Sequence, residues 1–182
     1  MNKEMTGDEV ISRGAHRQAI KTGLPDELII TSHDVGCCAF QDALFCSMLL
    51  EALDRGGVPT PYIEFSDRGG VRVFVAKKLG QVEVSAEMGG LTGDEICVIA
   101  KNCLKSEFGS EIDNLAKSAF ASLRDFFKTK GLMLVAMKFS LGVGQTVLSD
   151  GERLLVFGLI GPEDIVVLDD SSREVKNPQF LF

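Results

Sequence analysis

The chain has 182 residues, of which 45% are hydrophobic and 25% charged, and its formal net charge is −7. This size and balance predict one domain over 1–182, with 1–7 and 171–182 irregular or flexible. An acidic chain without a Lys/Arg cluster excludes nucleic acid as an expected partner. Because no stretch reaches the roughly 18 consecutive apolar residues of a membrane span, and 1–7 lacks a hydrophobic signal region, we predict a cytoplasmic location and no membrane partner.

The first part of the chain predicts two helices and a strand. Residues 8–22 carry apolar side chains at helical spacing before a Gly-Leu-Pro stop, which indicates a short amphipathic helix. A short strand is expected over 28–31. Residues 36–53 are apolar nearly all round, which predicts a helix buried on several sides that ends before Gly56 and Gly57.

Three strands and a helix are predicted next. The stretches 62–65, 71–76 and 82–86 are rich in β-branched and aromatic residues and are separated by turn residues, so we expect a meander. Thr92 is a suitable N-cap for a helix over 95–105.

A long helix is predicted over 110–128, because its apolar residues recur at the spacing of a core-facing stripe. These residues are Ile112, Leu115, Ala116, Ala119, Phe120, Leu123, Phe126 and Phe127. Strands over 132–139, with an extension to 147, over 154–160 and over 165–168 complete the chain, with turns at Asp150-Gly151 and Gly161-Pro162.

The predicted fold class is α+β, with helices packed on antiparallel β meanders. The expected order is α-βββ-αα-βββ with an extra N-terminal helix. The cysteines are odd in number and fall in predicted apolar helices, so we expect them to be reduced and buried. They are Cys37, Cys38, Cys46, Cys97 and Cys103.

Thiol and zinc chemistry are weakly supported. His33 and Asp34 precede Cys37 and Cys38, an arrangement that could serve a nucleophilic thiol or a metal. A thiol enzyme needs a histidine from elsewhere in the fold, and the other histidine is His16 in the first predicted helix. A structural zinc site needs four ligands, and no second Cys/His pair is suitably spaced. We therefore predict no metal site.

Glu111 and Asn114 are the best candidate site residues. Both lie outside the apolar stripe of the long helix, and residues three apart are neighbours on a helix surface. A Glu can pair with a partner's lysine, and an Asn amide can orient a water molecule toward a phosphoryl group. The alternative is that both residues simply favour solubility and the helix dipole.

The segment from Glu111 to Ala119 resembles the helix of the CheC/CheX family of chemotaxis phosphatases, and the resemblance covers roughly 37–169. It implies that Glu111 contacts the lysine of a phosphorylated response regulator and that Asn114 orients the attacking water on its phospho-aspartate. It implies no cofactor for the chain itself, since the partner's receiver domain would hold any magnesium. The chain departs from the family pattern at Glu107 and Met137, so both an active phosphatase and a silent relative are consistent with it.

A non-enzymatic adaptor or chaperone-type binding module is the competing interpretation. Small acidic proteins with exposed sheet edges bind partners by strand addition. The apolar end at Phe180, Leu181 and Phe182 is consistent with protein binding. Both interpretations predict a protein partner, which for the phosphatase belongs to signal transduction, and a homodimer is compatible with either.

Overall fold

The computed structural model describes the backbone of residues 9–13, 17–21, 27–32, 37–60, 62–65, 70–74, 77–87, 95–101, 105–146, 149–157 and 160–182, and side chains within 41–60, 79–86, 95–101, 108–144, 151–157 and 160–182. Across these residues the elements follow the order βββ-α-ββββ-α-βββ, with short 3-10 helices η1 and η2 near the end. The α+β class with antiparallel sheets is confirmed, but the expected order of elements differs from the observed one.

The first sheet has the strand order β1-β2-β3-β5-β4, and each neighbouring pair is antiparallel. Its strands are β1 (Glu9–Arg13), β2 (Arg17–Lys21), β3 (Glu27–Ser32), β4 (Tyr62–Phe65) and β5 (Gly70–Phe74). The helix predicted over 8–22 is therefore wrong. Pairing between β1 and β2, and between β2 and β3, satisfies the backbone in place of helical hydrogen bonds.

The second sheet is built around one long strand. Its strands are β6 (Lys77–Glu87), β7 (Glu95–Lys101), β8 (Met133–Thr146), β9 (Ser149–Phe157) and β10 (Ile165–Leu168). The order is β10-β8-β6-β7, and β9 pairs with the later part of β8. The helix predicted over 95–105 is wrong in 95–101, which form β7, and β6 leaves the predicted meander to join this sheet.

Helices α1 (Cys37–Arg55) and α2 (Lys105–Lys128) end in the same way. Gly57 and Gly131 have φ values of 72° and 70°, a left-handed conformation that glycine adopts without steric cost. The next residue in each case donates its N–H to the carbonyl five residues earlier, Val58 to Leu53 and Leu132 to Phe127, both at 3.0 Å. Each helix thus ends in a Schellman motif that satisfies its last carbonyl groups.

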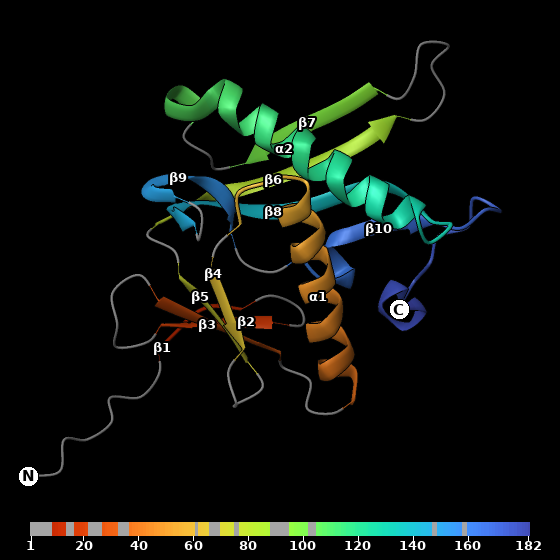
Figure 1. The fold of residues 1–182 in the computed structure, drawn as a ribbon, viewed down its shortest axis with the longest axis horizontal. Helices are drawn as coiled ribbons and strands as arrows, with labels where there is room; N and C mark the ends of the chain where they lie inside the picture. The colour runs from red at the N-terminus through yellow and green to blue at the C-terminus, as the bar shows by residue number, and fades with distance from the viewer. Residues whose placement is uncertain are drawn as a thin grey trace, which may run out of the picture.

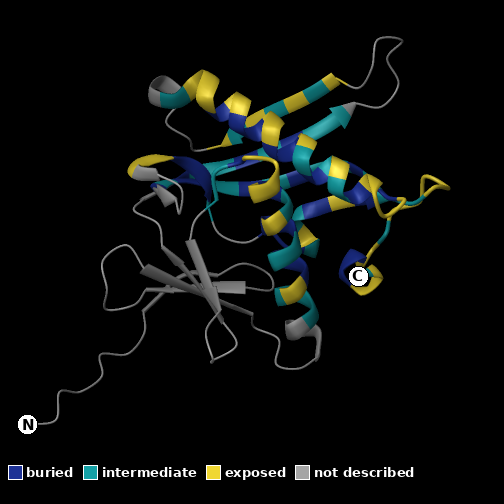
Figure 2. Cartoon of the chain, viewed as in Figure 1, coloured by how far each residue is buried: buried dark blue, intermediate teal, exposed yellow. Residues whose placement is uncertain are grey.

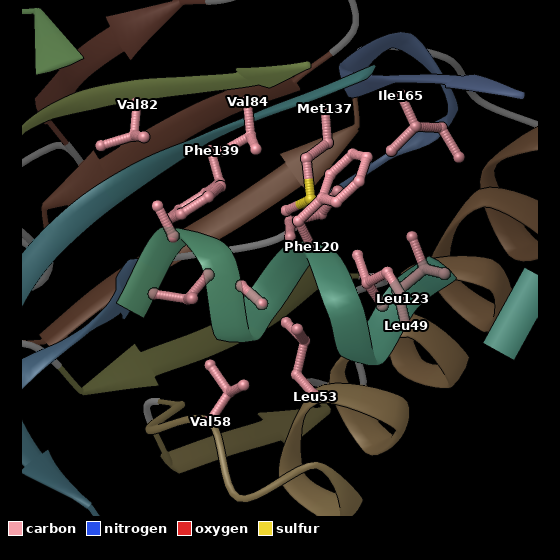
Figure 3. Packing of buried hydrophobic residues seen from close by; sticks show 14 of the residues in the cluster. Leu49, Leu53, Val58, Val82, Val84, Phe120, Leu123, Met137, Phe139 and Ile165 are labelled. Atoms are coloured by element: carbon pink, nitrogen blue, oxygen red, sulfur yellow. The ribbon is translucent and has the colours of Figure 1, made fainter. Parts of the chain in front are cut away.

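The core lies between α2, α1 and one face of the second sheet (Figures 1 and 3). Figure 2 shows α2 buried toward the sheet and exposed on its outer side, as its apolar stripe predicts. Phe120 and Leu123 of α2 are fully buried, as are Leu49 and Leu53 of α1. However, Leu44 is 42% exposed, so α1 is less enclosed than expected.

The end of the chain returns to the two helices. The 3-10 helix η2 (Pro178–Leu181) precedes Phe182, whose ring lies 5.5 Å from the rings of both Phe45 and Phe126. Lys130 places its ammonium 5.4 Å from the centre of the same ring. The last residue of the chain is therefore part of an aromatic cluster joining α1 and α2.

The cysteine predictions are met in part. Cys46 is buried, whereas Cys97 is exposed on a strand, and neither forms a disulfide. The side chains of Cys37, Cys38 and Cys103 lie outside the described residues. In the part of the chain that the structure describes, no helix combines the length and apolar character needed to cross a membrane.

Candidate charged site on the second sheet

The second sheet presents charged side chains among apolar ones on the side away from α2. Side chains alternate across a strand, so Val82 and Val84 of β6 are buried under α2 while Glu83 between them points to the other face. Glu83 lies directly opposite Lys138 on β8 and Ile99 on β7. The register therefore brings a carboxylate and an ammonium together at the middle of the sheet.

A bulge in β8 sets which of its side chains reach this face. Val166 of β10 pairs with Ala136, whereas the next residue, Val167, pairs with Leu134, so Val135 is the extra residue. Without this extra residue, strict alternation would put Leu134 and Lys138 on the same face. The bulge allows Leu134 to be fully buried while Lys138 is partly exposed.

Four charged side chains form what we call the charged face, namely Glu83, Lys101, Lys138 and Asp164. Lys101 Nζ lies 2.6 Å from Glu83 Oε1, and Lys138 Nζ lies 3.7 Å from Asp164 Oδ1. The first distance is that of a charge-assisted hydrogen bond, but the second is too long for one. Lys138 is therefore the cation whose ion pair a bound anion can most readily replace.

Asp164 is held in place by the backbone. It ends η1 (Pro162–Asp164), and the Gly161 N–H donates to its Oδ2 at 2.9 Å. Its side chain is 16% exposed, against 43% for Lys138. The carboxylate is thus fixed at the border of the charged face, whereas the lysine head group is open to solvent.

A cavity of about 270 Å³ lies over this face. Its lining combines charged residues with apolar ones: Glu83, Val84, Ser85, Ile99, Ala136, Met137, Lys138, Glu163, Asp164, Ile165 and Val166. Binding sites commonly pair an apolar wall with a few convergent polar groups. Within the described residues no three His, Cys, Asp or Glu side chains are grouped to hold a metal ion. The charged groups of the lining are three carboxylates, Glu83, Glu163 and Asp164, and one ammonium, Lys138.

A second hollow lies in the groove between α1 and α2 and has a volume of about 790 Å³. Its walls include Met48, Ala52, Ala121 and Phe126, together with the ion pair between Glu51 and Arg55. That pair joins neighbouring turns of α1, and both side chains are largely exposed. The groove is larger than the cavity on the sheet. It also has charged residues from both helices in its lining, because Asp125 of α2 faces the same hollow as Glu51 and Arg55.

The predicted site residues are both on α2. Glu111 and Asn114 are exposed, as expected from their position outside the apolar stripe. Neither lines the two hollows described above, although Ser118, one turn further along, lines the groove. His33 and Asp34 lie outside the described residues. A functional role for Glu111 and Asn114 stays a prediction.

Sequence reasoning missed the charged face because its members come from separate strands. Glu83, Lys138 and Asp164 are brought together only by strand pairing and by the bulge in β8. A local signal did exist, since Lys138 interrupts an apolar strand between the buried residues Met137 and Phe139. A lysine in that setting must reach the opposite face of the sheet.

The sequence matches no protein-family model and no curated protein. Solved structures do resemble it. A SAICAR synthetase in complex with ADP has a TM-score of 0.72 and 17% identity, over 96% of this chain and 90% of that chain. The chain has the fold of the SAICAR synthetases.

Two further solved structures with the SAICAR-synthetase fold are also similar to this chain. The phosphoribosylaminoimidazole-succinocarboxamide synthase from Ehrlichia chaffeensis has a TM-score of 0.71 and 15% identity, over 91% of this chain and 88% of that chain. The SAICAR synthase from Saccharomyces cerevisiae, complexed with SAICAR, has a TM-score of 0.71 and 11% identity, over 97% of this chain and 82% of that chain.

These similarities correct the functional predictions made from sequence. The CheC/CheX resemblance is wrong, because 91% and 96% of this chain match two structures with a different fold. The chemotaxis phosphatase function and the adaptor or chaperone interpretation are wrong for the same reason. A short helical motif of a Glu and an Asn three residues apart was too unspecific to identify a family.

Proposed function

We propose that this chain binds a purine nucleotide, with its phosphate groups at Lys138 on the charged face. The observation that carries the proposal is Lys138 itself, a half-exposed cation that faces a cavity and is only loosely paired with Asp164. Support from the fold comes from the similar structure solved with ADP, which matches over 96% of this chain.

The charges of the cavity are suited to a phosphate that carries its own metal ion. Phosphate oxygens accept strong hydrogen bonds from an ammonium group. Magnesium usually binds to nucleotide phosphates together with one or two protein carboxylates. Glu83, Glu163 and Asp164 are the described carboxylates that line the cavity, so they are the candidates to complete such a shell once the nucleotide is bound.

The apolar part of the cavity suits a flat or weakly polar portion of the ligand. Ile99 is 49% exposed and Val166 is 37% exposed, both unusually open for large aliphatic residues. They line the same cavity as Lys138. Covering them with a ligand would remove apolar surface from water and add to the binding free energy.

A ligase activity of the SAICAR synthetase kind is the second candidate. It is favoured by the match to a structure complexed with SAICAR, over 97% of this chain. A succinocarboxamide carrying a phosphoribosyl group is anionic, so it has the charge that Lys138 would attract. ADP binding with no formation of this product would support nucleotide binding alone.

The test is isothermal titration of the full chain with ADP and magnesium. Lys138→Ala should weaken ADP binding by roughly tenfold or more, the loss expected for one charged hydrogen bond of about 1.5–3 kcal/mol. Lys117→Ala, an exposed lysine on α2, is the matched control and should bind ADP as the wild type does. The proposal fails if the wild type does not bind ADP, or if both variants bind equally well.

A further inference from the structure

β7 is a regular edge strand. It ends the second sheet, with β6 as its neighbour in the described part of the chain (Figure 1). Its seven pairs with β6 run from Glu95 to Lys101 without a register shift. Strand edges in soluble proteins are usually blunted by bulges, proline or inward-pointing charges. Between its two terminal charges, β7 contains only Ile96, Cys97, Val98, Ile99 and Ala100.

The other edges described here are less suited to further pairing. β10 has only four residues, and its last residue, Leu168, forms a bridge with Glu174. In the first sheet, β4 also has four residues, and β1 contains an irregularity between Val10 and Ser12. β9 is a longer edge of nine residues, but Val156 within it donates its N–H to the Pro59 carbonyl at 3.0 Å. β7 therefore offers seven residues in regular register along its edge.

Both faces of β7 carry apolar surface that further pairing would cover. On the outer face Ile99 is 49% exposed and Cys97 is exposed. On the inner face Ile96, Val98 and Ala100 are only partly buried, whereas Val82 and Val84 of β6 are 0% and 1% exposed. Val82 and Val84 in the middle of β6 are thus more deeply buried than the inner face of β7.

The charges at the two ends of β7 indicate which strand can pair with it. We propose that β7 pairs antiparallel with β7 of a second copy of this chain, with Val98 opposite Val98 at the centre. In this register Glu95 of each copy lies opposite Lys101 of the other, so one pair of opposite charges lies at each end of the paired strands. Cys97 then lies opposite Ile99, which joins the exposed apolar residues of the outer face. Cross-strand pairs of both kinds stabilise sheets.

The consequence is a sheet that continues across two copies. Lys101 also pairs with Glu83 at 2.6 Å, and an ammonium has three N–H groups, so it can serve both carboxylates. Because Ile99 lines the cavity of the charged face, the second copy would border the proposed nucleotide site. The pairing itself does not depend on nucleotide binding.

Charge reversal tests this register. Sedimentation velocity of the full chain should show a monomer–dimer equilibrium at protein concentrations up to about 1 mM. Glu95→Lys alone places lysines opposite each other, and Lys101→Glu alone places glutamates opposite each other, so each variant should be monomeric. A mixture of the two variants should recover the dimer, because every opposed pair is then complementary.

Recovery on mixing separates pairing from misfolding, since a misfolded variant would not regain a partner. Lys117→Glu on α2 changes the charge by the same amount away from β7 and should dimerise as the wild type does. Diagonal neighbours across such a pair lie about 7–8 Å apart, so a short bismaleimide should link Cys97 of the two copies and fail with Cys97→Ser. A wild type that is monomeric throughout, or single variants that still dimerise, would overturn the proposal.

Discussion

Gly56 lies against Ser122 so closely that a methyl group on Gly56 would stand 2.0 Å from Ser122 Oγ and 2.7 Å from its Cβ. The end of α1 and the middle of α2 therefore approach each other at a point where only a hydrogen atom fits. Ser122 is itself anchored, because its hydroxyl donates to the Ser118 carbonyl at 2.9 Å. This contact fixes the spacing of the two helices at the groove.

Gly56→Ala should destabilise the fold by about 1–3 kcal/mol, the usual cost of overpacking. The matched control is Gly109→Ala in α2, where an added Cβ meets nothing within 4 Å. That change should stabilise the chain by about 0.5–1 kcal/mol, since alanine is the better helix residue. Urea unfolding of both variants measures the two effects, and an unaffected Gly56→Ala would mean that the helices can separate freely.

Phe182→Ala should destabilise the fold by roughly 1–3 kcal/mol, because the ring is half-buried among Phe45, Phe126 and Phe127. Phe180→Ala is the control, since that ring is 56% exposed. It should change stability by less than about 0.5 kcal/mol. Thermal unfolding compares the two variants, and equal losses would contradict a specific role for the last residue.

Leu123→Ala should cost about 2–5 kcal/mol, because Leu123 is fully buried between α2 and the rest of the core (Figure 3). Asn114→Ala on the exposed side of the same helix should change stability by less than about 0.5 kcal/mol. Guanidinium unfolding of the pair tests the orientation of α2. A large loss in Asn114→Ala would make that residue structural.

Asp169 should make folding depend on pH in the acid range. The Arg173 backbone N–H at 2.9 Å, the Arg173 guanidinium and the Ser171 N–H hold the pKa of this carboxyl below its ordinary value. A lowered folded-state pKa means that the stabilisation is complete above the unfolded-state value of about 3.9 and is lost as pH falls through the folded-state pKa.

The measurement compares the free energy of unfolding of the wild type with that of Asp169→Asn across the acid pH range. The wild type should be the more stable protein above about pH 4, and the difference should shrink as the pH falls below that value. A difference that stays constant down to the lowest pH would show that the turn around Asp169 does not depend on its charge.

Elements whose local pattern is unambiguous could be predicted from sequence. The glycines that end α1 predicted that helix to within two residues. The apolar stripe predicted α2 over 110–128, although the helix begins at Lys105, and β4 and β10 have the predicted bounds. In each case the residues near one another in sequence determine the structure, through periodicity or through a left-handed glycine.

The two wrong helices failed because their structure depends on distant partners. The segment 95–101 carries a helix-start signal before it, but its β-branched Ile96, Val98 and Ile99 pair with β6. The segment 8–22 has apolar residues at a spacing that also fits two short strands, and Gly14 falls between them. The charged face was missed for the same reason, since strand pairing alone unites Glu83 with Lys138.

The position of β8 in the chain has a consequence for how the molecule is made. This 14-residue strand pairs with β6, β9 and β10, and two of these partners follow it in the sequence while β6 comes far earlier. A growing polypeptide that has emerged from the ribosome only as far as α2 has made Val82 and Val84 but not the strand that must lie beside them. Such late, long-range pairing slows folding and leaves apolar surface open to aggregation, so we expect the nascent chain to expose Val82 and Val84 until β8 has been made.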